Sequence, residues 1–281
     1  MKERRINPEI IQRFQKYLEE GEKSDATIEK YIRDIAAFAL YIGGSAIAKE
    51  TVIAYKQYLL EKNYAIRSIN SMLASINSLL CFLGWTDLKV KSLKIQQSAF
   101  CPEEKELTRA EYERLCHTAQ KKHNERLCLI LQTICSTGIR VSELPFITAE
   151  AVKDGKAVVS LKGKTRVIFL VKDLRKKLLR YMSGQEISDG CVFITRTGKP
   201  IDRSNIWREM KGLCEEADVD PKKVFPHNLR HLFARIFYNL EKDIVKLADV
   251  LGHSSINTTR IYIISTGSEH RHYMEQMRLL I

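Results

Sequence analysis

The chain of 281 residues is long for one compact domain and comfortable for two, because domains cluster near about 100–150 residues. Its 44% hydrophobic and 28% charged residues are ordinary for a globular protein and exclude a chain that is mainly disordered. No apolar run is long enough to cross a bilayer, and no signal-peptide core follows the basic first residues. We therefore expect a cytoplasmic protein.

Positive charge is in excess along the whole chain. Lysines and arginines number 46 against 34 acidic residues, which gives a net charge of +12. The excess is +4 over residues 1–100 and +8 over residues 101–281, so it is not confined to a tail. This balance favours a polyanionic partner, either nucleic acid or an anionic membrane surface. If the partner is nucleic acid, we expect both halves to contact it.

The seven cysteines are odd in number, and no two of them have the C-x-x-C spacing. This pattern argues against a disulfide framework and against a zinc site. We expect reduced, mostly buried cysteines and no bound metal.

Residues 1–96 are expected to form a helical domain, because apolar residues recur at helical spacing in four segments. The second segment ends at the glycine pair 43–44, and the third and fourth are expected over 51–62 and 68–83. The fourth carries a face of small polar side chains. Such a face suits either close approach to a DNA backbone or plain solvation, and the sequence leaves both readings open.

Residues 97–105 lack periodicity and are interpreted as a linker to a second domain over 106–281. That domain begins with a capping box, in which Thr108 is the N-cap and Glu111 follows three residues later. A helix is therefore expected to start there.

Further on, the hydrophobic period changes to two over residues 148–171, which predicts a small antiparallel sheet of three strands. Asp154-Gly155 and the turn at 162–165 are expected to connect these strands. Helical periodicity resumes at Asp173 and continues toward the end of the chain.

Four separated segments of the second domain carry side chains suited to chemistry. The first is TGIRVSEL at 137–144, with an arginine just after a glycine, and the second is a lysine in the expected hairpin turn. The third is the pair His227 and Arg230, which share a helical face. The fourth is His253, followed nine residues later by Tyr262. Each alone has an ordinary explanation, such as a surface ion pair or a core histidine.

Together and in this order, TGIRVSEL, the lysine hairpin, H-x-x-R-H and LGHSSINTTRIY closely resemble the tyrosine recombinases, or phage integrase family. The resemblance covers residues 105–265, and the first hundred residues are similar to the core-binding domain of that family. It implies a mainly α-helical fold. A SAM-like core-binding domain would precede a mixed α+β catalytic domain with a small antiparallel sheet.

The resemblance implies a site-specific recombinase that cuts and rejoins DNA through a 3′-phosphotyrosyl link, in integration, excision, inversion or resolution. The catalytic residues that it implies are Arg140, Lys162, His227, Arg230, His253 and Tyr262. Because the covalent intermediate stores the bond energy, neither ATP nor a metal is needed, and no cofactor is expected.

The chemistry explains why these residue types are wanted. Two arginines can hold the non-bridging oxygens of a phosphodiester through their forked guanidinium groups. Ionising a tyrosine with a pKa near ~10 at pH 7 costs ~4 kcal/mol, so a base is useful, and His227 is the family's candidate. Lys162 would protonate the leaving 5′-oxygen, and His253 would donate a hydrogen bond to the scissile phosphate. Glu143, one turn from Arg140, is expected to orient it.

The lysine turn departs from the family pattern because it is one residue shorter, KGKTR at 162–166. Lys162 precedes the glycine and is the expected catalytic lysine, and Lys164 remains the alternative.

The expected partner is double-stranded DNA with short inverted-repeat core sites, bound in a clamp through phosphate contacts, with accessory proteins and no membrane. The candidate DNA contacts are Arg67, Asn70, Asn77, Lys164, Arg203, Asn205 and Arg208. The apolar tail at 268–281 is expected to dock on a neighbouring protomer and link a homotetramer. Two alternatives remain: a relaxase similar to type IB topoisomerases, and a catalytically silent DNA-binding regulator.

Overall fold

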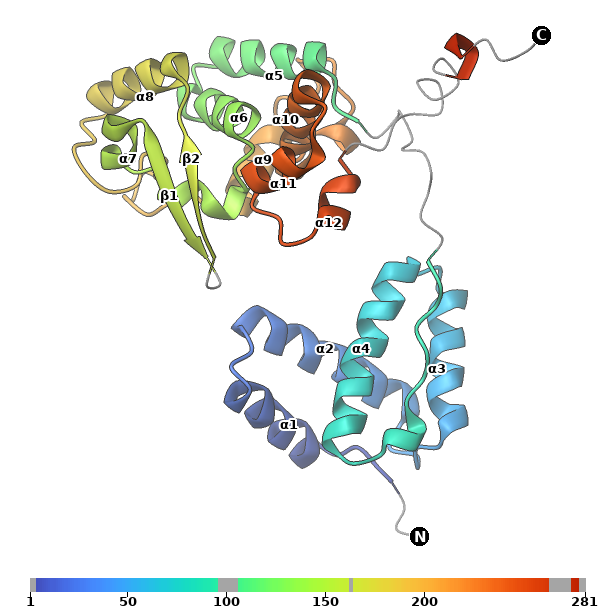
Figure 1. Cartoon of the computed structure of the whole chain (residues 1–281). Coiled ribbons are helices and arrows are strands. Elements are labelled where there is room, and N and C mark those ends of the chain that lie inside the picture. Colours follow the sequence, from blue (N-terminus) through green and yellow to red (C-terminus); the bar gives the residue numbers. More distant parts are fainter. Residues whose placement is uncertain (1–3, 96–105, 162–163, 263–273, 278–281) are drawn as a thin grey trace. The chain divides into compact units, whose positions relative to one another are not determined.

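A computed structural model describes residues 4–95, 106–161, 164–262 and 274–277. The chain divides into two compact units, Met1–Gln97 and Ser98–Ile281, which are described one at a time (Figure 1). Most of the expected linker, 97–105, lies outside the described residues. No described helix is long and apolar enough to cross a membrane.

The first unit is a bundle of helices around one core. Its elements are α1 (Pro8–Glu20), α2 (Asp25–Ile42), α3 (Lys49–Glu61), α4 (Ile66–Phe82) and the short 3-10 helix η1 (Thr86–Leu88). Gly43 ends α2 in the left-handed conformation, as predicted, because a residue with no Cβ adopts it without strain. The core is aromatic and aliphatic, and Phe14, Ile35 and Leu73 are fully buried in it.

The polar face of α4 braces the chain segment that leaves the bundle. The Asn77 amide donates to the carbonyl of Val90 and accepts from its N–H, at 2.9 and 3.1 Å. Asn70 makes the same two bonds to Leu93, at 2.9 and 2.7 Å. These asparagines therefore satisfy backbone groups of an extended segment that has no strand partner of its own. One reading of the sequence was that this face is only solvated. The hydrogen bonds of Asn70 and Asn77 show that it also contacts the protein backbone.

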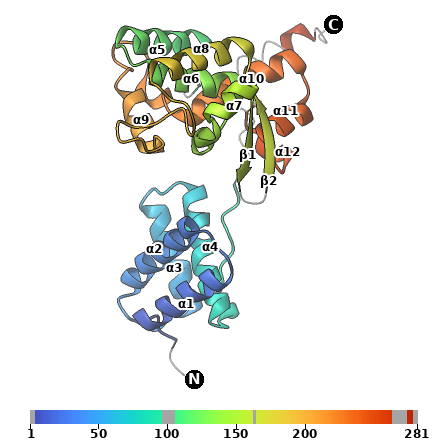
Figure 2. The same cartoon turned by 90° about the vertical axis from the view of Figure 1, so that its left-hand side faces the viewer.

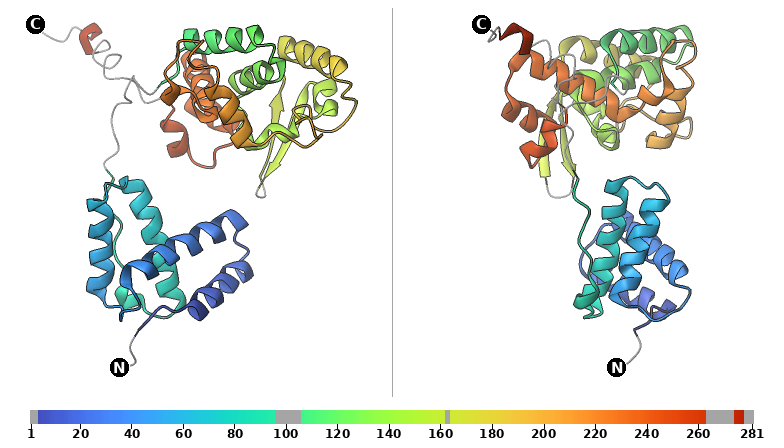
Figure 3. Two further views of the ribbon diagram at one scale, coloured as in Figure 1. Left: turned by 180° about the vertical axis from the view of Figure 1, so that it is seen from behind. Right: turned by 90° about the vertical axis from the view of Figure 1, so that its right-hand side faces the viewer.

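The second unit is also mainly helical. Its elements are α5 (Arg109–Lys121), α6 (Glu125–Thr137), η3 (Val141–Phe146), α7 (Ala149–Asp154), β1 (Lys156–Leu161), β2 (Lys164–Phe169), α8 (Lys172–Gly184), α9 (Arg203–Lys211), η4 (Pro221–Lys223), α10 (Pro226–Glu241), α11 (Ile244–Leu251) and α12 (Ile256–Arg260). Helix α6 is central: it packs against α5, α8, α9 and α10, and most of its side chains are buried (Figures 1 and 3). The predicted capping box opens α5, with Thr108 and Glu111 exchanging their two hydrogen bonds.

The sheet has two strands in the part of the chain that is described, and the prediction of three was wrong. β1 and β2 pair antiparallel, with Val159 opposite Arg166, at the edge of the helices (Figure 2). The segment expected to be the first strand is helix α7, which Thr148 caps by accepting from the N–H of Ala151. Gly155 then ends this helix at φ +75° instead of closing a hairpin. A glycine after an aspartate serves both turns equally well, so the dipeptide alone did not distinguish them.

The cysteines in the described residues are free thiols, and half of these six are buried. Cys116, Cys128 and Cys214 are buried, two others are half-buried and Cys81 is exposed, while Cys101 lies outside the described residues.

Candidate active site

Gly138 brings Arg140 to the site by ending α6 abruptly. It lies at φ +63°, and a Cβ added there would lie 2.5 Å from the ring of Phe233. Only glycine both adopts this left-handed backbone without strain and leaves room for the Phe233 ring. The chain then passes through the buried Ile139 and enters η3, whose N-cap is Arg140.

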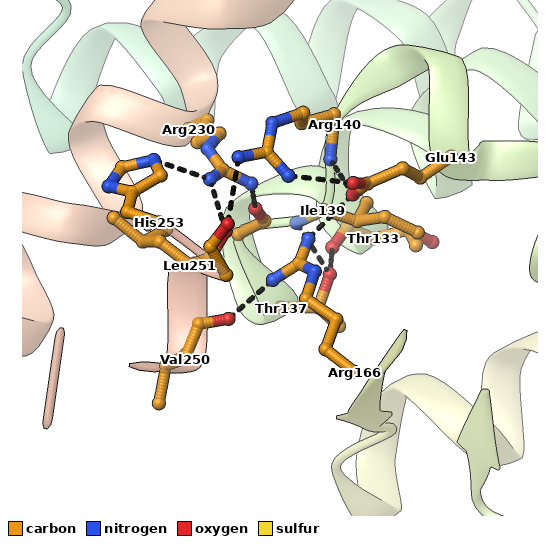
Figure 4. A network of polar contacts seen from close by, with 12 residues as sticks. Thr133, Thr137, Ile139, Arg140, Glu143, Arg166, Arg230, Val250, Leu251 and His253 are labelled. Carbon is orange, nitrogen blue, oxygen red and sulfur yellow. Dashed lines mark hydrogen bonds and ion pairs between the residues drawn. The ribbon is translucent and has the colours of Figure 1, made fainter. Parts of the chain in front are cut away.

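Glu143 is a buried carboxylate held between two guanidinium groups (Figure 4). It accepts from Nη1 of Arg140 at 2.7 Å and from Nη2 of Arg166 at 2.5 Å, and its second oxygen also accepts from the Arg140 backbone N–H. Burial would raise the pKa of Glu143, but the bonds from Arg140 and Arg166 outweigh it and lower the pKa below its usual value. Glu143 therefore contacts Arg140 through both of its oxygens, and its role in orienting that arginine stays a prediction.

Arg230, on α10, is 1% exposed and is held by backbone carbonyls from two distant segments (Figure 4). Its Nη1 donates to the carbonyl of Gly138, and its Nη2 donates to that of Leu251 at 2.7 Å. Burial, followed by the positive charge of Arg140, lowers the pKa of Arg230 to about 10, so it stays charged at neutral pH. Backbone carbonyls carry no net charge and do not neutralise the Arg230 guanidinium. The site therefore keeps a positive charge that can attract an anion.

His253 is fixed by contacts at both ring nitrogens. Nε2 lies 3.0 Å from Nη2 of Arg230, and Nδ1 lies 2.8 Å from the hydroxyl of Thr259. Because a guanidinium only donates, Nε2 accepts here, which assigns the ring proton to Nδ1. Burial and then the charge of Arg230 lower the pKa of His253 to about 4, so the ring is neutral near pH 7.

Tyr262 is 3% exposed and is surrounded by three imidazole rings. Its hydroxyl lies 3.4 Å from Nε2 of His227. The ring centroids of His231 and His253 lie 4.2 and 5.4 Å from that of Tyr262. Burial and the charge of Arg230 lower the pKa of His227, so its ring is neutral near pH 7 and free to accept a proton.

A cleft of about 880 Å³ opens beside these groups. Arg140, Glu143, Arg166 and His253 are among the side chains that line it. Arg140 and Arg166 contact the Glu143 carboxylate, and Arg230 contacts His253 beside them. Because Asp249 also lines the cleft, three guanidinium groups stand against two carboxylates, which leaves one positive charge for a bound anion. No cluster of three or more histidine, cysteine or acidic side chains suited to a metal occurs among the described residues.

The structure brings together five of the six predicted catalytic residues, from α10 and from the segments that follow α6, α11 and α12: Arg140, His227, Arg230, His253 and Tyr262. Lys162 lies outside the described residues, and so does the side chain of Lys164.

The sequence motifs did not single out Arg166, Thr259 or His231 for catalysis. No local pattern marks Arg166, because its contact with Glu143 spans 23 residues. His231 directly follows the H-x-x-R motif, and this position was the available signal for its contact with Tyr262.

The predicted DNA contacts are spread over both units. Arg67 is exposed on α4, and Arg203 and Arg208 are exposed on α9. Arg203 is close enough to His227 for its charge to lower the pKa of that ring. Asn205 is tied to Asp202 and Arg208 by side-chain hydrogen bonds of 3.1 and 3.2 Å.

Fold and site define a mainly helical protein in which a tyrosine, three histidines and a set of arginines meet beside a cleft. Residues 105–269 match the phage integrase family, and residues 11–87 match its N-terminal SAM-like domain. The chain therefore belongs to the phage integrase family, and both the resemblance and the mainly helical fold predicted from the sequence are confirmed.

Similar proteins cover the whole length of the chain. The tyrosine recombinase XerA of Pyrococcus furiosus is 29% identical over 290 residues, covering 100% of this chain and 98% of that protein. XerH of Campylobacter jejuni is 36% identical over 148 residues, covering 50% and 42%. A crystal structure of XerA recombinase has a TM-score of 0.55 at 26% identity, covering 97% of this chain and 99% of that one.

DNA complexes share the fold at lower identity. The XerH complex with a palindromic difH substrate, after cleavage, has a TM-score of 0.72 at 18% identity and covers 88% of this chain and 78% of that one. A lambda integrase dimer on a COC′ core site has a TM-score of 0.74 at 16% identity, with 92% and 78% covered.

Proposed function

We propose that the protein is a site-specific DNA recombinase that cuts and rejoins strands through a covalent link to Tyr262. The observation that carries this proposal is the Tyr262 hydroxyl, 3.4 Å from a neutral His227 and beside the buried, charged Arg230. A nucleophile, a base and a phosphate clamp thus converge at one place. The matches to XerA, XerD and XerH recombinases along the chain support the same activity.

In the proposed reaction the Tyr262 oxygen attacks the scissile phosphorus while His227 accepts its proton. The bond from phosphorus to the 5′-oxygen breaks, and that oxygen leaves as a hydroxyl after protonation by Lys162 or Lys164. Arg140 and Arg230 offset the charge that grows on the non-bridging oxygens. A 5′-hydroxyl from a second strand reverses these steps and rejoins the DNA.

His253 takes a role that differs in detail from the predicted one. In the free protein Nε2 accepts a hydrogen bond from Arg230, so this nitrogen has no proton to give. We propose that His253 first holds Arg230 in place, and that donating to a phosphate requires the proton to move from Nδ1 to Nε2.

The partner that we propose is duplex DNA with short inverted-repeat sites, because the net charge of +12 extends over both units. The XerH and lambda integrase structures named above are complexes with a DNA substrate and a core site. A homotetramer on DNA, linked through the tail at 268–281, accessory proteins and a cytoplasmic location complete the proposal. Most of that tail lies outside the described residues.

The comparisons do not favour the two alternatives, a relaxase similar to type IB topoisomerases and a silent regulator. The sequence retains all six residues that the chemistry requires, whereas a silent copy is free to lose them.

The test needs no known target site. The purified protein is incubated with fragmented genomic DNA from its source and quenched with detergent, and the protein-linked DNA is sequenced. Tyr262→Phe removes the nucleophile, and Tyr17→Phe is a matched control because Tyr17 is half-exposed in the first unit. We expect adducts at a shared inverted repeat for wild type and Tyr17→Phe, and none for Tyr262→Phe. Adducts that persist in Tyr262→Phe would refute the assigned nucleophile.

A further inference from the structure

Arg166, on strand β2, is not used in the proposed reaction, yet it reaches into the site. Its side chain is only 12% exposed. Nη2 donates to Glu143 at 2.5 Å, and Nη1 donates to the backbone carbonyl of Val250 (Figure 4). One guanidinium fork therefore joins β2 to two segments far away in the chain.

Each of these partners supports one half of the phosphate clamp. Glu143, the first partner, holds Arg140 through its other oxygen at 2.7 Å. Val250, the second partner, directly precedes Leu251, whose carbonyl accepts from Arg230 at 2.7 Å. Arg166 thus contacts the support of both clamp arginines.

The stem of Arg166 supplies a second, independent observation. A Cβ added at Gly252 would lie 2.5 Å from Cδ of Arg166, and Gly252 itself lies at φ +63°. Glycine therefore permits the close approach of the Arg166 stem to the backbone that leads into His253. A larger residue at 252 would push the two segments apart.

The tip of Arg166 faces protein groups, which distinguishes it from a phosphate ligand. Arg140 has a side chain that is 38% exposed, against 12% for Arg166. The Nε of Arg166 is buried with no hydrogen-bond partner among the described residues. Both of its terminal nitrogens are directed at Glu143 and Val250, so the fork is used in bridging.

We propose that Arg166 is a positioning residue, which ties β2 to Glu143 and to the Val250–Gly252 backbone and thereby fixes Arg140 and Arg230 against the scissile phosphate. The inference rests on the proposed recombinase function. A displacement of about 1 Å in a positioned group can cost about 10²-fold in rate. We therefore expect Arg166→Ala to slow DNA cleavage by about 10²-fold while leaving DNA affinity within about threefold.

The test compares two substrates built on the inverted repeat recovered with Tyr262. One has an ordinary phosphodiester at the cleaved position, and the other has a methylphosphonate, in which a neutral methyl replaces one non-bridging oxygen. The methylphosphonate carries one negative charge fewer than the phosphodiester, so it needs less stabilisation from Arg140 and Arg230. A displacement of these two arginines should therefore slow its cleavage less. We expect the ratio of wild-type to Arg166→Ala cleavage rates to shrink by at least tenfold on the methylphosphonate. Arg140→Ala is the comparison for a lost clamp group.

Arg175 offers a matched control on α8. Its guanidinium also bridges two protein groups, the backbone carbonyls of Val152 (at 2.9 Å) and Lys153, but it does not line the cleft. Arg175→Ala should leave the cleavage rate of both substrates close to that of wild type. Arg166→Lys keeps the charge and most of the stem but lacks the fork, so we expect it to behave like Arg166→Ala.

The outcomes separate this inference from the proposed function. Equal loss on both substrates, or full activity of Arg166→Lys, would overturn the positioning role, because neither follows from a misplaced clamp. If Arg166→Ala does not fold, as judged by thermal unfolding, Arg166→Lys carries the same comparison. If wild type fails to cleave the phosphodiester, the proposed function fails, and the inference fails with it.

Discussion

Three imidazoles around Tyr262 are kept neutral by their surroundings. Burial, then the neighbouring His227 and Arg230, lower the pKa of His231 to about 4, and His253 reaches a similar value through burial and Arg230. Neutral rings allow His227 to accept a proton and let the phenol ring pack without a further positive charge beside the arginines. The site thus places its positive charge on guanidinium groups, which hold it at every pH relevant to the cell.

The depressed histidine pKa values predict how stability depends on pH. In the unfolded chain these rings take up a proton near pH 6.5, but in the folded unit His231 and His253 do so only near pH 4. Between those values the unfolded state binds more protons, so stability is full above about pH 6.5 and falls as pH drops. We expect the thermal midpoint to decrease from pH 7 to pH 5.

Two variants test whether the histidines of the site cause this decrease of the thermal midpoint with falling pH. His231→Gln should flatten the decrease between pH 7 and pH 5, because it removes one of the depressed groups. His117→Gln should leave it unchanged, since His117 is exposed on α5. A slope as steep in His231→Gln as in wild type would contradict the assignment.

At the scale of elements, the placement of glycines decides where helices end and how the side chains of the site are directed. Gly138 and Gly155 both end helices at positive φ, at +63° and +75°. A Cβ at Gly138 would lie 2.5 Å from Phe233, whereas at Gly155 its nearest neighbour is 3.7 Å away on the Arg175 side chain. The two positions therefore share backbone strain but differ in packing.

We expect Gly155→Ala to cost about 1–2 kcal/mol in the free energy of unfolding, from the left-handed backbone alone. Gly138→Ala should cost about 1–3 kcal/mol more, because Phe233 must also move. Urea unfolding of the two variants measures the difference, and DNA cleavage should fall only in Gly138→Ala, which displaces Arg140. Equal costs for the two would show that Phe233 adjusts freely.

The asparagines on α4 give a second prediction for this scale. Asn77 exchanges two hydrogen bonds with the backbone of Val90, each contributing about 1 kcal/mol. Asn77→Ala should therefore lower the free energy of unfolding by about 1–2 kcal/mol. Ser78→Ala, one residue further on, should change it little. If Asn77→Ala leaves urea unfolding unchanged but weakens DNA binding, its contact with DNA outweighs its structural one.

Local chemistry explains which elements the sequence predicted well. The capping box at Thr108 and the glycine that ends α2 depend on neighbours within a few residues, so the sequence contains the whole signal. The strand expected before Asp154 failed because the same dipeptide also ends a helix, and the cap at Thr148 decided the outcome.

The residues of the site also divide into those that a local motif predicts and those that only long-range contacts reveal. Arg140, His227, Arg230 and Tyr262 stand in motifs whose spacing is readable, and the structure brings them together. Arg166 stands in no such motif, because its partners come from an acidic residue 23 positions earlier and from a backbone carbonyl 84 positions later. Contacts of that range follow from the fold and leave no periodic trace in the sequence.

At the scale of the whole molecule, charge is the property that both units share. Each carries a positive excess, +4 over residues 1–100 and +8 over residues 101–281. Binding of duplex DNA by such a protein releases condensed counterions in proportion to the phosphates contacted. The affinity should therefore fall linearly with salt on a double-logarithmic plot, by about 10³–10⁵ between 50 and 200 mM salt for about 6–10 contacts.

Single substitutions in each unit test whether both contact the DNA. Arg67, on α4, and Arg203, on α9, are exposed arginines in different units. If each contacts a phosphate, replacing either by alanine should reduce the salt slope by about one, and replacing both should reduce it by about two. Fluorescence anisotropy titrations at several salt concentrations give these slopes. A slope that responds to Arg203→Ala but not to Arg67→Ala would remove Arg67 from the predicted contacts, because its guanidinium would then release no counterion on binding.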